Sequence, residues 1–215
     1  MNLIIFGDSI AQGCWDDEGG WPARIRQEIN QKQIEKAEPF FDYNLTYLRG
    51  VSGDTSEGLK DRILNEIEAM SDTNRDITAV VAIGINDSIL EEDGNRVSRG
   101  DFRENLEELI EKCREETDQL ILVGLTPVDE SRADPMPDEP EASFLNSEIE
   151  DYEKIIEEVA EEKSTKFIPL FDRLNEESWD EKLWDGVHPN PDGHEKIFEI
   201  VKPEIFEKLD FQLSD

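Results

Sequence analysis

The stretch Asn2-Leu3-Ile4-Ile5-Phe6-Gly7-Asp8-Ser9, close to the start of the chain, decides the fold. Its four consecutive apolar residues, two of them β-branched, predict a short buried strand rather than a helix. The following Gly-Asp-Ser predicts a turn that ends the strand and leaves a hydroxyl group at its carboxyl end. Open parallel α/β sheets bind their ligands at the carboxyl ends of the strands. If this strand belongs to such a sheet, Ser9 is a candidate nucleophile.

Strand-like and helix-like segments alternate along the rest of the 215-residue chain. The pattern predicts further strands at residues 43–48, 77–85, 120–125 and 166–171. It predicts helices at residues 21–35, 55–70, 98–116, 141–163 and from 190 onward. We expect Ile34 on the buried side of the first helix, and we expect Pro203 to kink or interrupt the last one.

This alternation predicts an α/β fold, a doubly wound sandwich around a five-stranded sheet. The strand at residues 77–85 is apolar on both faces, as a parallel sheet covered on both sides requires. Right-handed crossovers favour the flavodoxin-like strand order 2-1-3-4-5. We expect a single domain over residues 1–215.

The chain is strongly acidic, with 54 Asp and Glu residues against 22 Lys and Arg residues and a net charge of −32. This charge would repel nucleic acids and anionic membranes, so neither is an expected partner. The acidic residues are spread over every predicted helix, which is typical of the surface of a halophilic protein. Salt screens like-charge repulsion, so molar salt would stabilise such a protein. The alternative is an acidic protein that is merely very soluble.

The cysteine and hydrophobicity patterns predict a soluble cytoplasmic protein. Cys14 and Cys113 are far apart and in no metal-binding or redox spacing, so we expect free thiols in a reducing compartment. The N-terminus lacks the charged region, hydrophobic region and cleavage site of a signal peptide. No apolar stretch approaches the roughly 20 residues that span a bilayer.

Residues 127–140 differ in composition from the rest of the chain, because four prolines stand among acidic residues and almost nothing is apolar. Strand and helix patterns resume afterwards, so the segment is expected to be a long loop rather than a linker. Loops of this length in compact domains often serve as functional lids.

Polar residues follow the carboxyl ends of the predicted strands. Ser9 follows the first strand, Gly53 lies in the turn after the second, and Asn86 follows the third. The segment after the fifth strand contains Trp184-Asp185-Gly186-Val187-His188-Pro189. These residues supply a hydroxyl group, a turn with a free backbone N–H, an amide, and a carboxylate with an imidazole. Acyl transfer needs these groups as nucleophile, oxyanion donors, general base and the group that orients the base.

Each of these residues also has a structural interpretation. Ser9 suits a turn or a helix cap, Gly53 suits a positive φ angle, and Asn86 suits hydrogen bonds to its own backbone. His188 could simply precede a helix, and Asp185 could cap a turn. The conjunction at successive strand ends favours catalysis over these separate interpretations.

Other kinds of site fit the sequence less well. Asp185, His188 and His194 are candidate metal ligands, but His194 lies inside a predicted helix and the three lack a compact ligand spacing. The Gly-x-Ser-x-Gly elbow of α/β-hydrolases does not occur. Neither a P-loop nor a Gly-x-Gly-x-x-Gly motif occurs, so nucleotide binding has no motif to support it.

At these residues the chain resembles the SGNH (GDSL) hydrolase family. The four blocks of the family resemble Gly7-Asp8-Ser9, Ser52-Gly53-Asp54, Gly84-Ile85-Asn86-Asp87 and Asp185-Gly186-Val187-His188-Pro189, in that order. The resemblance implies a flavodoxin-like three-layer α/β/α fold and a serine esterase or lipase activity that uses no metal or cofactor. It also implies an oxyanion hole built from the backbone N–H groups of Ser9 and Gly53 and the amide of Asn86.

We therefore expect a serine ester hydrolase in which Ser9 attacks the acyl carbonyl, His188 transfers the proton and Asp185 orients the imidazole. The expected substrates are small-molecule esters of short acyl or acetyl groups. Carbohydrate O-acetyl esters and thioesters are alternative substrates, and a non-catalytic binding protein on the same fold is a less favoured alternative. Residues 10–20, 88–100 and 127–144 are expected to form the pocket walls.

Overall fold

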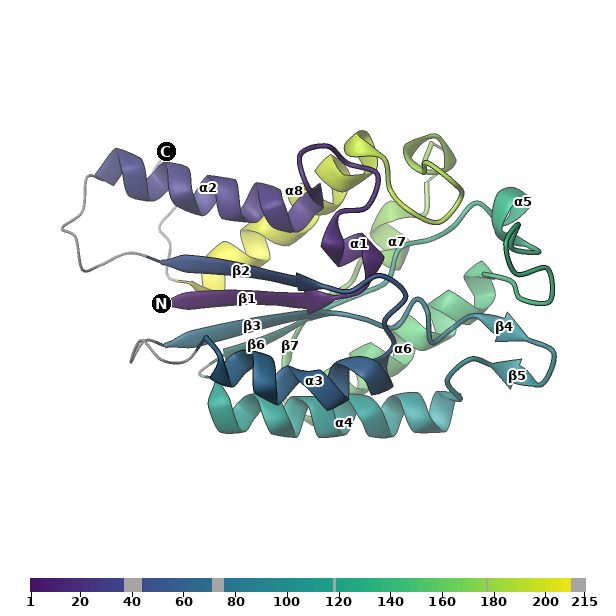
Figure 1. The fold of residues 1–215 in the computed structure, drawn as a ribbon, viewed down its shortest axis with the longest axis horizontal. Coiled ribbons are helices and arrows are strands. Elements are labelled where there is room, and N and C mark those ends of the chain that lie inside the picture. Colours follow the sequence, from purple (N-terminus) through teal and green to yellow (C-terminus); the bar gives the residue numbers. More distant parts are fainter. Residues whose placement is uncertain (37–43, 71–75, 118, 177, 210–215) are drawn as a thin grey trace.

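The computed structural model describes residues 1–36, 44–70, 76–117, 119–176 and 178–209. Its centre is a parallel sheet with the strand order β2-β1-β3-β6-β7 (Figure 1). In chain order the strands are β1 (Asn2–Gly7), β2 (Leu45–Gly50), β3 (Ile77–Ala82), β6 (Gln119–Val123) and β7 (Lys166–Ile168). The predicted order 2-1-3-4-5 is therefore confirmed, since these are the five strands of the sheet in sequence.

Strand β1 lies inside the sheet because its residues are apolar on both faces. Each residue from Asn2 to Gly7 pairs with one residue of β2 and one of β3, and all six are buried. A strand that is covered on both faces and paired on both edges is held rigidly. The chain that leaves its carboxyl end therefore starts from a fixed position.

Helices cover both faces of the sheet (Figure 1). One layer contains α2 (Gly20–Lys36) and α8 (Pro191–Lys208), which pack against each other. The opposite layer contains α3 (Ser56–Glu68), α4 (Arg99–Glu116) and α6 (Asn146–Glu162), with α4 between the other two. The predicted three-layer α/β/α fold is confirmed.

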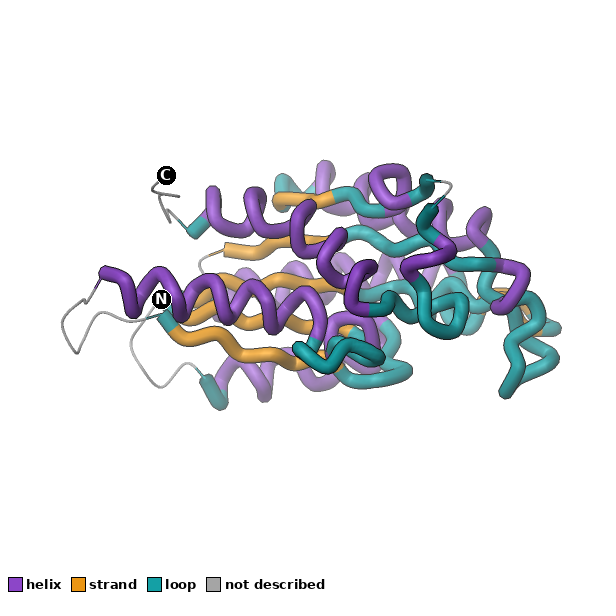
Figure 2. The backbone as a smooth tube through the Cα atoms, turned by 90° about the horizontal axis from the view of Figure 1, so that it is seen from above, coloured by secondary structure: helices purple, strands orange, loops and turns teal. Residues whose placement is uncertain are grey.

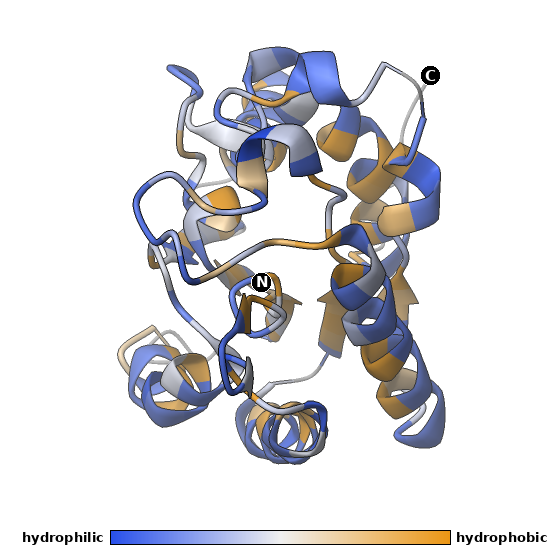
Figure 3. Ribbon diagram, turned by 90° about the vertical axis from the view of Figure 1, so that its right-hand side faces the viewer, coloured by the Kyte–Doolittle hydropathy of each residue, from blue (hydrophilic) through white to orange (hydrophobic). Residues whose placement is uncertain are grey.

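Helices α3, α4 and α6 are amphipathic, with their buried apolar residues at helical spacing and hydrophilic residues between them (Figure 3). Helix caps also follow the sequence: Thr55, Ser98 and Asn190 each accept a hydrogen bond from a backbone N–H in the first turn of α3, α4 and α8. Within the described residues, no helix is both long enough and apolar enough to cross a bilayer.

Short elements lie at the end of the molecule where the strands end, as do most of the loops (Figures 1 and 2). They are α1 (Ser9–Gln12), β4 (Leu90–Glu91), β5 (Gly94–Asn95), α5 (Glu130–Ala133), α7 (Phe171–Leu174) and the 3-10 helix η1 (Asp180–Lys182). Strands β4 and β5 form a hairpin, and Leu90 also bridges to Ser143 in the segment before α6. The predicted loop 127–140 thus contains a helical turn, α5.

Three of the predicted strands are shorter than expected. The third ends at Ala82, the fourth at Val123 and the fifth at Ile168. Gly84 has a φ angle of 133°, which turns the chain away from the sheet. Residues beyond these ends, including Ile85 and Leu125, are buried although they are not in strands. The apolar pattern in the sequence therefore continues past the end of each strand, because the residues that follow are also buried.

Predictions on three helices also differ from the structure. Ile34 is 73% exposed, so its predicted inward position is wrong. Helix α6 begins at Asn146 instead of residue 141, where the backbone N–H of Asn146 donates to the Glu130 carboxylate. Helix α8 continues through Pro203 without interruption, because Val201 and Ile205 on either side are buried. The predicted strand residue Tyr43 lies outside the described residues.

Candidate active site

Ser9 is positioned directly by the end of β1. Gly7 lies so close to β3 that a Cβ atom there would be 2.2 Å from the Ala82 carbonyl oxygen, which explains the glycine. Asp8 caps α1, since its carboxylate accepts a hydrogen bond of 2.9 Å from the Ile10 N–H. Burial raises the pKa of Asp8 to about 7, although backbone N–H groups of α1 oppose the shift. Ser9 is then the first residue of α1, so its own N–H has no acceptor within the helix.

The structure brings Ser9, His188 and Asp185 together as predicted. The Ser9 Oγ lies 2.8 Å from the Nε2 of His188, and the Nδ1 of His188 lies 2.7 Å from the Asp185 Oδ2. With a proton on Nδ1 donated to Asp185, Nε2 accepts the hydrogen bond of the Ser9 hydroxyl. This is the geometry that activates a serine nucleophile.

Asp185 is held in its charged form. Burial would raise its pKa, but hydrogen bonds from the His188 imidazole and from the backbone N–H groups of His188 and Val187 outweigh burial and hold the pKa well below its usual range. The two backbone N–H groups donate to Oδ1 at 2.8 and 3.0 Å. Asp185 is therefore an anion at neutral pH.

Gly53 and Asn86 lie on neighbouring turns that are tied to the Ser9 strand. The Asn86 Nδ2 donates a 2.9 Å hydrogen bond to the Asp54 carbonyl, next to Gly53. The N–H of Val51, in the same turn, donates to the Gly7 carbonyl. Gly53 has a φ angle of 76°, which favours glycine. In the part of the chain that the structure describes, the N–H groups of Ser9 and Gly53 have no hydrogen-bond acceptor.

A comparison with protein families identifies the family. The model of the GDSL-like lipase/acylhydrolase family matches residues 5–196, which include Ser9, Gly53, Asn86, Asp185 and His188. The chain belongs to this family. It is a serine ester hydrolase of the GDSL type, as the sequence blocks predict.

Solved structures of hydrolases share the fold of this GDSL hydrolase. The lipase/acylhydrolase from Enterococcus faecalis is 25% identical, with a TM-score of 0.71 and 96% of each chain covered. The alpha/beta hydrolase LAE5, from the metagenome of Lake Arreo, is 22% identical, with a TM-score of 0.71, and the similarity covers 99% of this chain and 96% of that one. The acetylxylan esterase Axe2 from Geobacillus stearothermophilus is 20% identical, with a TM-score of 0.68, over 95% of this chain and 93% of that one. No curated protein is significantly similar in sequence.

The structure does not place His194 with Asp185 and His188 in a metal site. His194 is fully buried in α8 of the GDSL hydrolase, and both its ring nitrogens contact backbone groups. Its Nδ1 accepts from the Trp21 N–H at 3.4 Å, and its Nε2 donates to the Cys14 carbonyl at 3.2 Å. Among the described residues, no three His, Cys, Asp or Glu side chains could together hold a metal ion.

Several residues that support the site carry no sequence motif. The Arg132 guanidinium, on α5, donates to the carbonyls of Asp180, Leu183 and Trp184, immediately before Asp185. The Asp129 N–H donates to the Gly186 carbonyl at 2.8 Å. The segment 127–140 therefore contacts the turn that carries Asp185 and His188. The hydrogen bonds from Arg132 to this turn all go to backbone carbonyls, and the contact is visible only in the structure. The sequence therefore does not indicate that Arg132 holds the turn.

Asp87 also supports the site, in a way that the sequence pattern did not predict. Its buried carboxylate accepts hydrogen bonds from the N–H and the hydroxyl of Ser56, at the start of α3. Burial raises its pKa to about 6, although these hydrogen bonds oppose the shift. Since Asp87 follows Asn86 directly, this contact fixes the turn that presents the Asn86 amide.

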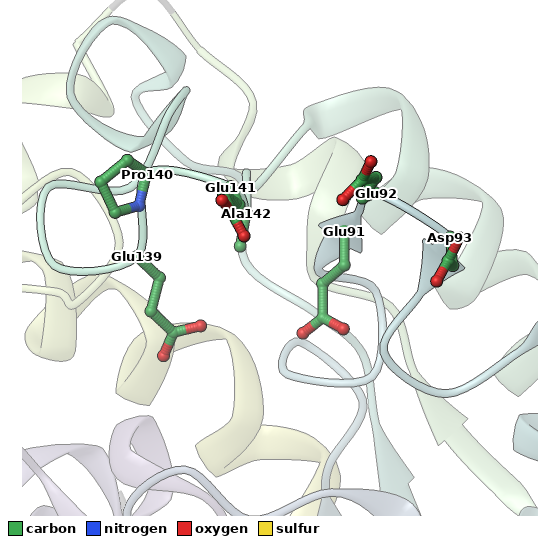
Figure 4. A pocket seen from close by; sticks show the side chains of 7 residues that line it. All are labelled: Glu91, Glu92, Asp93, Glu139, Pro140, Glu141 and Ala142. Carbon is green, nitrogen blue, oxygen red and sulfur yellow. The ribbon is translucent and has the colours of Figure 1, made fainter.

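An acidic cavity of about 490 Å³ is lined by none of the predicted catalytic or oxyanion-hole residues (Figure 4). It is lined by Glu91, Glu92, Asp93, Glu139, Pro140, Glu141 and Ala142. Arg96 links its two walls by ion pairs of 2.7 Å to Glu91 and 2.6 Å to Glu139. These ion pairs join the β4–β5 hairpin to the segment before α6. Two of the acidic residues that line the cavity therefore have a structural role in holding these two segments together.

Proposed function

We propose that this GDSL hydrolase cleaves small-molecule carboxylic esters through an acyl-enzyme on Ser9. The proposal is carried by one observation, the continuous hydrogen-bonded series from Ser9 Oγ through the His188 ring to Asp185, with separations of 2.8 and 2.7 Å. Ser9 begins α1 directly after the buried strand β1, whereas the other two residues come from one turn far along the chain. Their alignment supports a catalytic triad.

In the proposed reaction, the Ser9 oxygen attacks the acyl carbonyl while His188 Nε2 takes the hydroxyl proton. The tetrahedral intermediate collapses when His188 returns this proton to the leaving alcohol, which leaves an ester on Ser9. A water molecule then attacks the same carbonyl while His188 takes a proton from it, and the second tetrahedral intermediate collapses as His188 returns this proton to the Ser9 oxygen, which releases the acid and restores the Ser9 hydroxyl. Asp185 remains a carboxylate throughout and keeps the imidazole in the tautomer that accepts the proton.

We infer that the developing oxyanion is bound by the N–H groups of Ser9 and Gly53 and by the Asn86 amide. Ser9 is buried and its N–H has no acceptor among the described residues, which supports this role because buried N–H groups are normally paired. The Gly53 N–H, on an exposed turn, likewise has no acceptor among the described residues. The Asn86 amide donates one hydrogen to Asp54 and retains a second. Three donors that do not reorganise during the reaction suit transition-state stabilisation.

A second candidate substrate is an acetylated carbohydrate. It is favoured by the structural similarity to Axe2, which is described as an acetylxylan esterase. The net charge of −32 supports a neutral or cationic substrate over nucleic acid or an anionic membrane.

A fluorophosphonate probe and a series of esters test the proposal. The probe should label wild-type protein on Ser9 and leave the Ser9→Ala variant unlabelled. p-Nitrophenyl esters of increasing chain length, assayed beside acetylated xylo-oligosaccharides, would separate short-chain esters from carbohydrate esters. Turnover of every substrate at the wild-type rate by Ser9→Ala would refute the acyl-enzyme mechanism.

A further inference from the structure

Trp15 has a conformation that its packing does not explain. Its φ angle is 65°, in the left-handed region that bulky side chains rarely occupy, and its side chain is 56% exposed. Such strained backbone persists only where the surroundings enforce it. Because more than half of the indole is exposed, hydrophobic burial is a weak reason for a tryptophan here.

The loop that carries Trp15 is fixed on both sides. Gly13 approaches Gly19 and Gly20 so closely that a Cβ atom at Gly13 would lie 2.2 Å from the Gly19 carbonyl oxygen. The Asp16 carboxylate accepts from the Gly20 N–H and pairs with the buried Arg24 guanidinium. On the other side, His194 donates to the Cys14 carbonyl. The loop therefore presents Trp15 in one orientation.

The indole N–H of Trp15 donates to Asp185. Its Nε1 lies 3.1 Å from Oδ2, the same oxygen that accepts from His188. Asp185 then has four donors, which matches the acceptor capacity of a carboxylate: Trp15, the His188 ring and the N–H groups of Val187 and His188. Three of the four belong to the turn of residues 185–188 itself. Among the described residues, Trp15 is the only donor to this carboxylate from outside that turn.

The ring of Trp15 also contacts this turn. It stacks on Trp184, with ring centroids 6.2 Å apart and an angle of 24° between the planes. Trp184 is the residue before Asp185, and its side chain is 63% exposed. The stack and the hydrogen bond together restrict the position of the turn relative to the loop that follows Ser9.

We propose that Trp15 is a positioning residue, whose indole N–H fixes the Asp185 carboxylate and thereby aligns the His188 imidazole with Ser9. The hydrogen bond connects the loop after the nucleophile to the turn that carries the base. Without it, the turn could move as a unit with its internal hydrogen bonds intact, and the Ser9–His188 distance would no longer be fixed. This inference depends on the proposed catalytic triad.

Two replacements remove the N–H while keeping an aromatic ring. Trp15→Phe retains a ring that can stack on Trp184, and β-(3-benzothienyl)alanine at position 15 keeps the bicyclic shape with sulfur in place of N–H. With p-nitrophenyl acetate, we expect each to lower kcat about tenfold, the effect of one hydrogen bond to a charged group, and to leave KM within about twofold. Trp184→Phe is the matched control, because it keeps an aromatic ring in the stack and leaves the Trp15 N–H in place; its loss of kcat should be smaller than that of either Trp15 variant.

A double-mutant cycle with Asp185→Ala separates positioning from a general structural effect. If Trp15 acts through Asp185, Trp15→Phe should lower kcat less than about twofold in the Asp185→Ala background. An equal loss in both backgrounds, or wild-type kcat in the benzothienyl variant, would overturn the proposal. Wild-type turnover by Ser9→Ala or Asp185→Ala would instead overturn the proposed function. If Trp15→Phe unfolds, the benzothienyl variant decides the question alone.

Discussion

Replacing His194 with glutamine should flatten the dependence of stability on pH below neutrality. The neutral imidazole accepts from the Trp21 N–H through Nδ1 and donates to the Cys14 carbonyl through Nε2. A protonated ring has no acceptor, so its Nδ1–H would oppose the Trp21 N–H. Burial lowers the pKa of His194 to about 4; the Cys14 carbonyl and Asp16 favour protonation, and Arg24 and His188 oppose it.

The magnitude follows from this shift. In the unfolded chain the imidazole is exposed to water and has a pKa of about 6.5. Between pH 6.5 and 4 the unfolded state binds more protons than the folded one, so stability rises with pH. The contribution of His194 is therefore complete above about pH 6.5 and is lost as the pH falls through 4. The difference between a pKa of about 6.5 in the unfolded chain and about 4 in the folded protein corresponds to about 3 kcal/mol of unfolding free energy.

Urea unfolding of wild type and His194→Gln at pH 7, 6, 5 and 4, in constant molar salt, would measure this contribution. The surface carboxylates titrate in both proteins, so their effect cancels in the difference between the two free energies of unfolding. Wild type should be the more stable protein at pH 7, and its advantage should shrink by about 3 kcal/mol by pH 4. An advantage that is the same at every pH would refute the assignment of a neutral, buried His194.

Three further outcomes are expected. Asn86→Ala should lower kcat for p-nitrophenyl acetate by about 10²–10³, the usual effect of one lost oxyanion donor; wild-type kcat would remove Asn86 from the oxyanion hole. Burial raises the pKa of Glu153 to about 7, so its stabilising contribution is complete below about pH 4.5 and is lost as the pH rises through 7. Glu153→Gln should therefore gain stability relative to wild type between pH 5 and 8, as measured by urea unfolding, and a gain toward low pH would contradict this. Finally, raising NaCl from near zero to molar levels should raise Tm, because the net charge is −32; a Tm independent of salt would contradict the halophilic interpretation.

The sheet could be predicted because β1, β3 and β6 are largely apolar runs separated by helical periodicity, and its strand order because right-handed crossovers restrict the connections. The exact strand ends could not, since Ile83, Ile85 and Leu125 are buried beyond them. These apolar residues are buried beyond the carboxyl ends of the strands, although they form no strand pairs. The inward prediction for Ile34 failed for the opposite reason, because helical spacing continues after the helix has passed the core.

The residues of the proposed triad could be predicted because a nucleophile, an acid and a base must be particular residue types after particular strands. Trp15 and Arg132 could not, because their contacts depend on where loops meet in space. Arg132 binds backbone carbonyls, which every residue has, so its partners leave no trace in the sequence. The composition of segment 127–140 predicted a loop, whereas its contacts with the Asp185 turn required coordinates.

The two halves of the site are positioned by different kinds of structure. Ser9 follows a strand that is buried on both faces, so the core of the sheet fixes it. Asp185 and His188 belong to a turn between η1 and α8, and its position depends on hydrogen bonds from Arg132, Asp129 and Trp15. Such surface contacts open at lower free energy than a buried sheet. The distance between the nucleophile and its base is therefore more sensitive to the loops than to the core, and activity should be lost under conditions that leave the sheet folded.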